Sequence, residues 1–235
     1  MQVKTYLNTT KEEVEAKEHN IWIGISLGNK YFTKENIHAY ILWALKHTKD
    51  DVLVAIIDDI YAINLEVFDK RSKDSSLRRA RRKGDTKAVE VQEIVDGLSG
   101  RDKARVHIVR WIDLINSKYH SYRTKILYDE FESNKAFHDY ILEIIREGRS
   151  DRLQELDEAG IEKLAEYVLK EIPVFINGAK YKTKDGWKTY SLIPYPGLTK
   201  LDELFIGLQN KDLFSELAEK LKITDKIAIL EAYPR

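Results

Sequence analysis

Residues 21–58, IWIGISLGNKYFTKENIHAYILWALKHTKDDVLVAIID, determine the fold that this sequence predicts. The apolar run over residues 21–27 is typical of a buried strand, and Thr33 is a suitable cap for a helix that we expect to end near Lys49. Residues 51–58 form a second apolar run and predict a second buried strand. A strand, a helix and a strand in such close succession make a βαβ unit, whose strands are parallel and joined by a right-handed crossover.

The rest of the chain continues this alternation of strands and helices. Residues 65–98 predict a polar helical region, and residues 118–148 predict one long amphipathic helix. A further helix is expected at 159–175, and further strands at 106–111, 189–194 and 227–233. No linker, repeat or low-complexity tract divides the chain. We therefore expect a single α/β domain over residues 1–235, with a mostly parallel sheet and helices on both faces.

Composition excludes several kinds of site. Lys and Arg total 39, as do Asp and Glu, so the net charge of the 235 residues gives no sign of a polyanionic partner. Without cysteine, the chain forms no disulfide, thiolate metal site or cysteine nucleophile. It has no apolar signal core at its start and no apolar run of about 20 residues, so we expect a cytoplasmic protein without a membrane partner. The sequence leaves the oligomeric state open and slightly favours a monomer.

Ser26 is a candidate nucleophile. It follows the first apolar run and is flanked by Gly24 and Gly28, an arrangement that predicts a tight turn at the rim of the sheet. The Gly-x-Ser-x-Gly pattern also suits a serine esterase of the α/β-hydrolase type. Such an enzyme needs a late histidine, and no histidine follows His138. The remaining alternative is a turn in which the serine only caps the backbone.

Three more residues predict acid–base or binding chemistry. Tyr167 and Glu171 share a helix face at i, i+4 spacing, and Pro173 predicts that this helix ends close to Glu171. A helix C-terminus and partial burial both raise the pKa of a carboxyl group, which suits proton transfer or the binding of an ammonium group. Tyr195 is held stiffly between two prolines at a strand end. Ordinary packing and solvation are the alternatives for all three.

A concentrated basic segment lies between Lys70 and Lys87. On a helix, Arg78, Arg81 and Arg82 share one face. The segment lacks aromatic residues for base stacking, so it favours recognition of the phosphate backbone of a folded RNA. A solvated helix without a partner is the alternative.

Together these features resemble the tRNA-dependent cyclodipeptide synthases. The shared stretches are Gly-Ile-Ser-x-Gly-Asn-x-Tyr-Phe at 24–32 and Tyr-Val-Leu-x-Glu-x-Pro-x-Phe at 167–175, with the basic segment between them and Tyr195 after them. The resemblance implies a Rossmann-like domain, similar to the catalytic core of class I aminoacyl-tRNA synthetases, and an aminoacyltransferase that makes a diketopiperazine from two aminoacyl-tRNAs. The synthetase signatures and a phosphate-binding loop are absent from the sequence, which agrees with a reaction that needs no ATP, cofactor or metal.

The resemblance also implies a ping-pong mechanism. Ser26 would attack the ester of the first aminoacyl-tRNA, the second aminoacyl-tRNA would supply an amine, and a dipeptidyl-enzyme would cyclise off the serine. Glu171 and Tyr167 would hold the α-ammonium group of the first residue. Tyr195 would orient groups or relay a proton during cyclisation.

Other residues would bind the two parts of the substrate. Gly24 and Asn29 would support the pocket beside the nucleophile. Three apolar residues are candidates either for the pocket of the first amino acid or for ordinary core: Trp22, Val174 and Ile193. The cations that would grip the acceptor arm of the tRNA are Arg78, Arg79, Arg81, Arg82 and Lys83.

One position departs from many members of that family. They have histidine directly after the strand tyrosine, whereas this chain has Pro196. A branch of the family has proline there, and we place the chain in that branch, although it retains Asn29, which is often replaced in the branch. The main alternative function is a non-catalytic tRNA-binding relative of the synthetases, and the serine esterase is less favoured.

Overall fold

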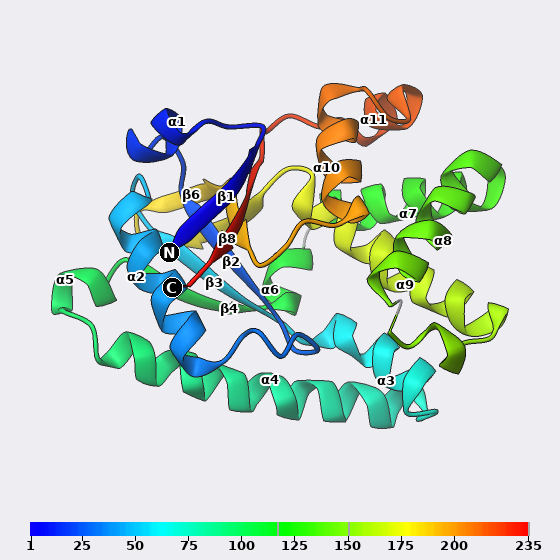
Figure 1. Cartoon of the computed structure of the whole chain (residues 1–235), viewed down its shortest axis with the longest axis horizontal. Coiled ribbons are helices and arrows are strands. Elements are labelled where there is room, and N and C mark those ends of the chain that lie inside the picture. The colour runs from blue at the N-terminus through cyan, green and yellow to red at the C-terminus, as the bar shows by residue number, and fades with distance from the viewer. Residues whose placement is uncertain (117, 150, 235) are drawn as a thin grey trace.

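The computed structural model describes residues 1–116, 118–149 and 151–234. Its centre is a six-stranded sheet with the order β1-β8-β7-β2-β3-β4 (Figure 1). From β8 to β4 the neighbouring strands run parallel, and β1 pairs antiparallel with β8. The strands are β1 (Gln2–Leu7), β2 (Ile21–Ser26), β3 (Val52–Ile57), β4 (Val106–Arg110), β7 (Leu192–Tyr195) and β8 (Ala228–Tyr233).

The predicted βαβ unit is β2, α2 (Lys34–His47) and β3. The Thr33 side chain accepts a hydrogen bond from the backbone N–H of Asn36 at 3.3 Å, so threonine caps the helix as expected. Strands β2 and β3 pair in parallel from Ile21 with Val52 to Ser26 with Ile57. Every residue of β3 is buried, which explains its unbroken apolar run.

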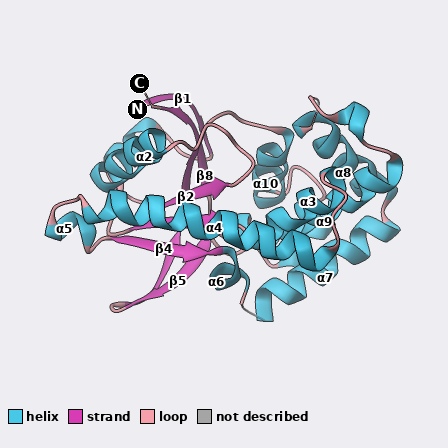
Figure 2. Cartoon of the chain, turned by 90° about the horizontal axis from the view of Figure 1, so that it is seen from below, coloured by secondary structure: helices cyan, strands magenta, loops and turns pink. Residues whose placement is uncertain are grey.

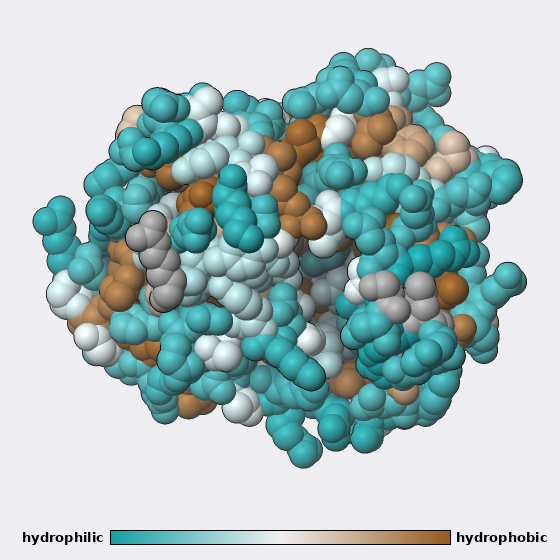
Figure 3. All heavy atoms as spheres, viewed as in Figure 1, coloured by the Kyte–Doolittle hydropathy of each residue, from teal (hydrophilic) through white to brown (hydrophobic). Residues whose placement is uncertain are grey.

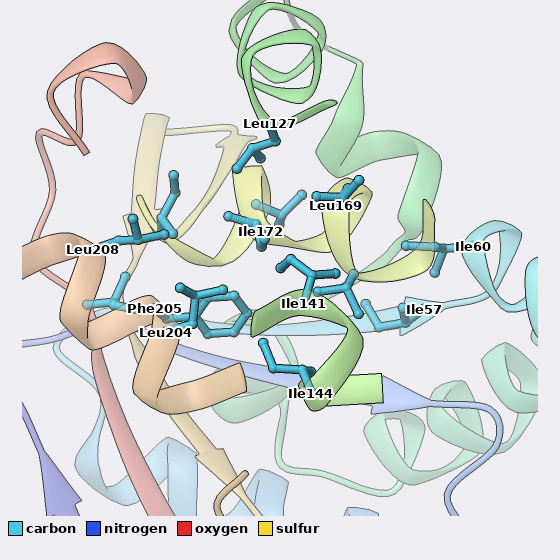
Figure 4. Close-up of a cluster of buried hydrophobic side chains, with 14 of the residues drawn as sticks. Ile57, Ile60, Leu127, Ile141, Ile144, Leu169, Ile172, Leu204, Phe205 and Leu208 are labelled. Carbon is cyan, nitrogen blue, oxygen red and sulfur yellow. The ribbon is translucent and has the colours of Figure 1, made fainter. Parts of the chain in front are cut away.

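Helices cover both faces of the sheet, as predicted. One face packs against α2 and the C-terminal half of α4 (Lys73–Asp96). The other packs against a group of helices in which side chains such as Leu127, Ile141, Leu169 and Phe205 meet (Figure 4). These helices include α6 (Trp111–Ile115), α7 (Lys118–Ser133), α8 (Lys135–Gly148), α9 (Glu158–Phe175) and α10 (Lys200–Asn210).

Shorter elements complete the chain. A separate hairpin of β5 (Ala179–Thr183) and β6 (Gly186–Tyr190) extends from the side of the sheet near β4 (Figure 2). The short helices are α1 (Lys11–Glu15), η1 (Asp59–Tyr61), α3 (Ala62–Phe68), α5 (Gly100–Lys103), η2 (Leu153–Glu155) and α11 (Ser215–Leu221). None of the helices within the described ranges is long and apolar enough to cross a membrane.

The structure corrects several expected boundaries. Residues 118–148 form two helices instead of one, because the Asn134 side chain accepts hydrogen bonds from the N–H groups of Ala136 and Phe137 and so caps a new helix. The region 65–98 likewise divides into α3 and α4, and the strand expected at 189–194 divides into β6 and β7. Pro173 lies inside α9 and does not end it. The sequence did not predict β1 or β5.

Candidate active site

A cavity of about 500 Å³ lies where the carboxyl ends of β2 and β7 meet the helices α8, α9 and α10. Parallel sheets commonly bind ligands at this edge. Figure 3 shows the surface hollowed between the part of the molecule that contains the sheet and the part that contains these helices. Seven of the predicted site residues line this cavity, namely Gly24, Ser26, Asn29, Tyr167, Glu171, Ile193 and Tyr195.

Ser26 is the last residue of β2 and is half-buried on the cavity wall. A turn follows it, in which the N–H of Asn29 donates to the Ser26 carbonyl at 3.2 Å. Gly28 suits this turn because a Cβ atom at this position would lie only 3.0 Å from the ring of Tyr61, which would have to shift to accommodate it. The glycine therefore lets the turn approach Tyr61 of η1 closely, and Ser26, just before this turn, lines the cavity.

Tyr167 reaches the cavity from α9. Burial raises the pKa of its hydroxyl well above the usual value, and the nearby charge of Glu171 acts in the same direction. Hydrogen bonding with the Ser26 side chain has the opposite, weaker effect on that pKa. The tyrosine therefore stays protonated beside the serine hydroxyl.

Glu171 lies one helical turn after Tyr167 on the same face of α9, as the spacing predicted. Burial raises its pKa to about 8, the charge of Asp202 adds to the rise, and Arg149 opposes it. The side chain still lines the cavity, so a substrate can reach it. The carboxyl group can therefore exchange a proton near neutral pH.

Arg149 is a cation of the cavity wall that the sequence did not reveal. Its Nη2 donates to Oδ1 of the buried Asn64 at 2.9 Å. Its charge lowers the pKa of Tyr167, Glu171 and Tyr195. The guanidinium group thus partly offsets the rise in pKa that burial causes in these three groups.

Asp202 is a second acidic group that sequence reasoning missed. Its Oδ2 accepts hydrogen bonds from the N–H (2.7 Å) and the hydroxyl (2.9 Å) of Thr199, which forms the cap of α10. Burial raises its pKa to about 6, although the Thr199 hydrogen bonds lower it. The Thr-x-x-Asp pattern signals a capping box in the sequence, but it does not signal a place in the cavity.

Tyr195 ends β7 and shares the cavity with Ser26. Asn29 Nδ2 donates to its hydroxyl at 3.3 Å, while Asn29 Oδ1 accepts from the N–H of Tyr31 at 2.9 Å. Burial raises the pKa of Tyr195, which keeps its hydroxyl protonated. Asn29 therefore connects the turn after the nucleophile with the strand tyrosine.

Of the three apolar candidates for the amino-acid pocket, only one lines the cavity. Ile193 lines the cavity, whereas Trp22 and Val174 belong to the core behind its wall and are absent from the residues that line it in the described chain. Trp22 is fully buried, and its ring lies 4.5 Å from that of Phe175, which does line the cavity. Alternation along β2 explains the arrangement: Trp22, Gly24 and Ser26 point to one face, and Gly24 leaves open the space that a side chain would fill.

The predicted basic residues occur on the exposed surface of α4. Arg78, Arg79 and Arg82 take part in no ion pair within the described part of the chain. Arg81 differs, because it forms two hydrogen bonds with the Asp59 carboxylate at 2.9 and 2.8 Å. The Nζ of Lys83 lies 5.0 Å from the ring centre of Tyr61, and Tyr61 lines the cavity. The basic face of α4, which consists of these five cations, thus adjoins the cavity wall through Lys83 and Tyr61.

Other chemistries find less support. No histidine is among the described residues that line the cavity, so Ser26 has no partner there for a hydrolase triad. The described residues also contain no group of three or more potential metal ligands. The arrangement suits acyl transfer from an activated ester, with carboxyl groups and a cation around the reacting atoms.

The fold and the cavity together define a Rossmann-like α/β protein with a ligand site at the carboxyl edge of its sheet. The sequence matches the family model for cyclodipeptide synthase over residues 1–203, and no curated protein matches it. The chain therefore belongs to the cyclodipeptide synthase family. Members of this family are aminoacyltransferases that use aminoacyl-tRNAs.

Solved structures from this family have the same fold. A cyclodipeptide synthase from Bacillus thermoamylovorans is 20% identical, with a TM-score of 0.72 over 96% of this chain and 93% of that chain. The Mycobacterium tuberculosis protein whose structure relates these enzymes to type I tRNA synthetases is 17% identical, with a TM-score of 0.71 over 97% and 91%. A synthase from Candidatus Glomeribacter gigasporarum, bound to Phe-tRNAPhe, is 15% identical, with a TM-score of 0.58 over 92% and 88%. The predicted resemblance to a synthetase core is confirmed at the level of the fold.

Proposed function

We propose that the chain joins the amino acids of two aminoacyl-tRNAs into a diketopiperazine, through covalent intermediates on Ser26. One observation carries this proposal: Ser26, Tyr167 and Glu171 line one cavity, although they come from distant parts of the sequence. A tRNA-binding module without catalysis would need the basic face of α4 but not these three side chains together. The presence of all three side chains in one cavity favours an enzyme over a binding module.

In the first step, Ser26 Oγ forms a bond with the ester carbonyl carbon of the first aminoacyl-tRNA. The bond from that carbon to the ribose oxygen breaks, and the serine proton passes to the departing oxygen. An ester activated in this way is more reactive than an amide, so a histidine base is less necessary. Tyr167 lies beside the reacting hydroxyl and can hydrogen-bond the substrate.

In the second step, the amine of the serine-bound residue attacks the ester of the second aminoacyl-tRNA, and the second tRNA leaves with a proton. This direction differs from the sequence-based expectation that the second substrate supplies the amine. Attack by that amine would leave the dipeptide on the tRNA, whereas a dipeptidyl-enzyme requires the reverse. In the third step, the free amine of the dipeptide attacks the serine ester, closes the ring and returns the proton to Ser26 Oγ.

Glu171 fits the proton transfers that these steps need. An α-amino group has a usual pKa of about 7.7–8.0, and burial raises the pKa of Glu171 to about 8. A proton can therefore move between the two groups at little free-energy cost. An ammonium group must lose its proton before the nitrogen can attack, and a general base is most effective when its pKa lies near the operating pH.

Intact-mass measurement after mixing with aminoacyl-tRNA tests the proposal. We expect the wild-type protein to gain the mass of the aminoacyl group, and the Ser26→Ala variant to gain none. Ser133→Ala is a matched control, since its hydroxyl lies on α7 and bonds the Asp129 carbonyl. An adduct that persists in Ser26→Ala would refute the serine nucleophile.

The alternatives give different results in the same experiment. A binding module would bind tRNA but remain unmodified in every variant. An esterase would hydrolyse simple esters in the absence of tRNA. Mass spectrometry of the reaction products then identifies the two amino acids that are joined.

A further inference from the structure

Asp58 links the nucleophile-bearing part of the sheet to its neighbours. It directly follows Ile57, the residue of β3 that pairs with Ser26 of β2. Its side chain is only 2% exposed. Its Oδ2 accepts a hydrogen bond from Nε of Arg110 at 2.7 Å and another from Nη2 of the same residue, and its Oδ1 accepts from the N–H of Trp111 at 3.3 Å. The carboxylate is thus fixed to the end of β4.

The Arg110 guanidinium group also reaches α4. Its Nη1 donates to Asp85 Oδ1 at 2.7 Å, and its Nη2 donates to the backbone carbonyl of Arg81 at 3.2 Å. One planar cation therefore joins the end of β4, the end of β3 and two successive turns of α4. A forked guanidinium group fixes direction as well as distance, which a lysine cannot do.

Gly84 is the point at which α4 comes closest to this ion pair. A Cβ atom there would lie 2.7 Å from Asp58 Cβ and 2.6 Å from Arg110 Nη2. Gly84, Ala80 and Ser76 are all buried and are spaced by one helical turn, so small residues face the rest of the protein. A larger residue at position 84 would force the helix outward, because the Asp58 Cβ atom is attached to the backbone and cannot yield.

The position of α4 determines where its cations lie. Because Ser76, Ala80 and Gly84 face inward, Arg78 and Arg82 point away from the sheet into solvent. Figure 2 shows α4 lying across the sheet and extending beside α3, toward the helices that wall the cavity. A small shift of the helix would move the whole basic face relative to Ser26.

We propose that the Asp58–Arg110 ion pair and Gly84 are positioning residues, which hold α4 so that a tRNA on its basic face presents its aminoacylated end to Ser26. The inference rests on the proposed function, because it names the element that aligns the same substrate. Asp58, Arg110 and Gly84 are absent from the described lining of the cavity. They act through the placement of α4.

The Gly84→Ala variant tests this proposal without changing any charge. Gly100→Ala is the matched control, because a Cβ atom there would meet nothing within 4 Å. Two substrates are compared: aminoacyl-tRNA, and 2′(3′)-O-aminoacyl adenosine, which carries the same ester but no acceptor arm. For Gly84→Ala we expect kcat/KM for aminoacyl-tRNA to fall about tenfold or more, because misplacing a reacting group by about 1 Å can lower the rate about 100-fold. The rate of Ser26 acylation by the adenosine ester should change less than about twofold.

Equal losses of activity toward both substrates in Gly84→Ala would overturn the proposal. The contact of Gly84 with Asp58 and Arg110 would then support the cavity itself. An unchanged kcat/KM for aminoacyl-tRNA in a folded Gly84→Ala variant would overturn it too. Should Gly84→Ala fail to fold, Arg110→Lys retains the charge and loses the fork, and the same split between substrates is expected. Thermal unfolding of each variant shows whether it is folded.

The dissociation constant for uncharged tRNA separates this inference from the proposed function. If wild-type protein acquires no acyl group from aminoacyl-tRNA, the proposed function fails, and the tRNA affinity of Gly84→Ala still tests the placement of α4. An affinity equal to that of the wild type would then overturn the inference. If acylation occurs but Gly84→Ala behaves as the wild type with every substrate, the inference fails alone.

Discussion

At the scale of single residues, the site depends on acidic groups held where ionisation is unfavourable. Glu171 and Asp202 share one cavity, and burial raises the pKa of both. Arg149 supplies a compensating positive charge. Such surroundings destabilise the folded state at neutral and alkaline pH, but they give the carboxyl group of Glu171 a pKa close to that of an amine.

We expect the Glu171→Gln variant to be more stable than the wild type at alkaline pH and inactive in diketopiperazine formation. The pKa of Glu171 is 4.5 in an unfolded chain and about 8 in the folded protein. As pH rises between these values, the unfolded state loses its proton first, so the free energy of unfolding falls. Glutamine cannot ionise, so its advantage begins above about pH 4.5 and is complete above about pH 8. Scanning calorimetry measures the difference, where about 1 kcal/mol corresponds to about 2–4 °C for a chain of this size.

Glu166→Gln on the same helix is the control and should change stability in the opposite direction. Burial raises the pKa of Glu166, but its hydrogen bonds and ion pairs with Lys163 and Lys170 outweigh burial and lower it overall. The stability that it contributes is present above the usual pKa of a glutamate and is lost in acid. Destabilisation of the Glu171→Gln variant at alkaline pH would contradict the raised pKa of Glu171 in the folded protein.

The sequence predicted those site residues that form a recognisable pattern with nearby residues in the chain. Glycines flank Ser26, helical spacing pairs Tyr167 with Glu171, and prolines flank Tyr195. The sequence did not predict Arg149, because Asn64 orients it from 85 positions away. It predicted Trp22 as a candidate for pocket or core, and only the packing against Phe175 assigns it to the core.

At the scale of elements, α4 combines a buried stripe of small residues with an exposed basic face. Its five predicted cations are not equivalent. Asp59, the first residue of η1, holds Arg81 through two hydrogen bonds, whereas Arg78 and Arg82 form no ion pair in the described part of the chain. A phosphate that approaches Arg81 must compete with this carboxylate. Asp59 therefore weakens the attraction of α4 for RNA in general.

We expect Asp59→Asn to increase the affinity for tRNA, most strongly at low salt. Removing the carboxylate frees Arg81 for a phosphate contact, and each added contact steepens the plot of log affinity against log salt by about 0.7–0.9. Filter binding over a range of salt concentrations measures both effects. Asp96→Asn is the control: it removes one negative charge and the ion pair with Lys103 at the opposite end of α4. Equal gains in the two variants would show that net charge, and not Arg81, is responsible.

Sequence patterns predicted long elements better than short ones. The βαβ unit was predicted correctly because its strands are buried apart from Ser26 and its helix has a threonine cap. The division between α7 and α8 was missed, since the apolar stripe continues past Asn134 and only the hydrogen bonds of that side chain reveal the new helix. Lysine alternates with other residues along β5, so the hairpin lacks the apolar run that predicted the other strands.

At the scale of the whole molecule, one sheet carries two cores. Ile21, Ile23 and Ile25 of β2 pack on the side of α2, whereas Trp22 packs on the side of α9. A single strand therefore contributes to both cores in alternation. The two ends of the chain also meet, because β1 and β8 pair from Gln2 with Tyr233 onward (Figure 1). Neither core can separate from the sheet without disrupting the other.

This sharing predicts that the chain unfolds as a single domain, in one cooperative transition. Ile41→Ala removes buried side-chain volume from the core beside α2, and Leu169→Ala does so in the core beside α9. Each substitution should lower the free energy of unfolding by about 2–5 kcal/mol. In urea, curves from far-UV circular dichroism and from tryptophan fluorescence should coincide for the wild type and for both variants. Two separate transitions, one of them sensitive to Ile41→Ala alone, would mean that the cores unfold independently and that the single-domain prediction is wrong.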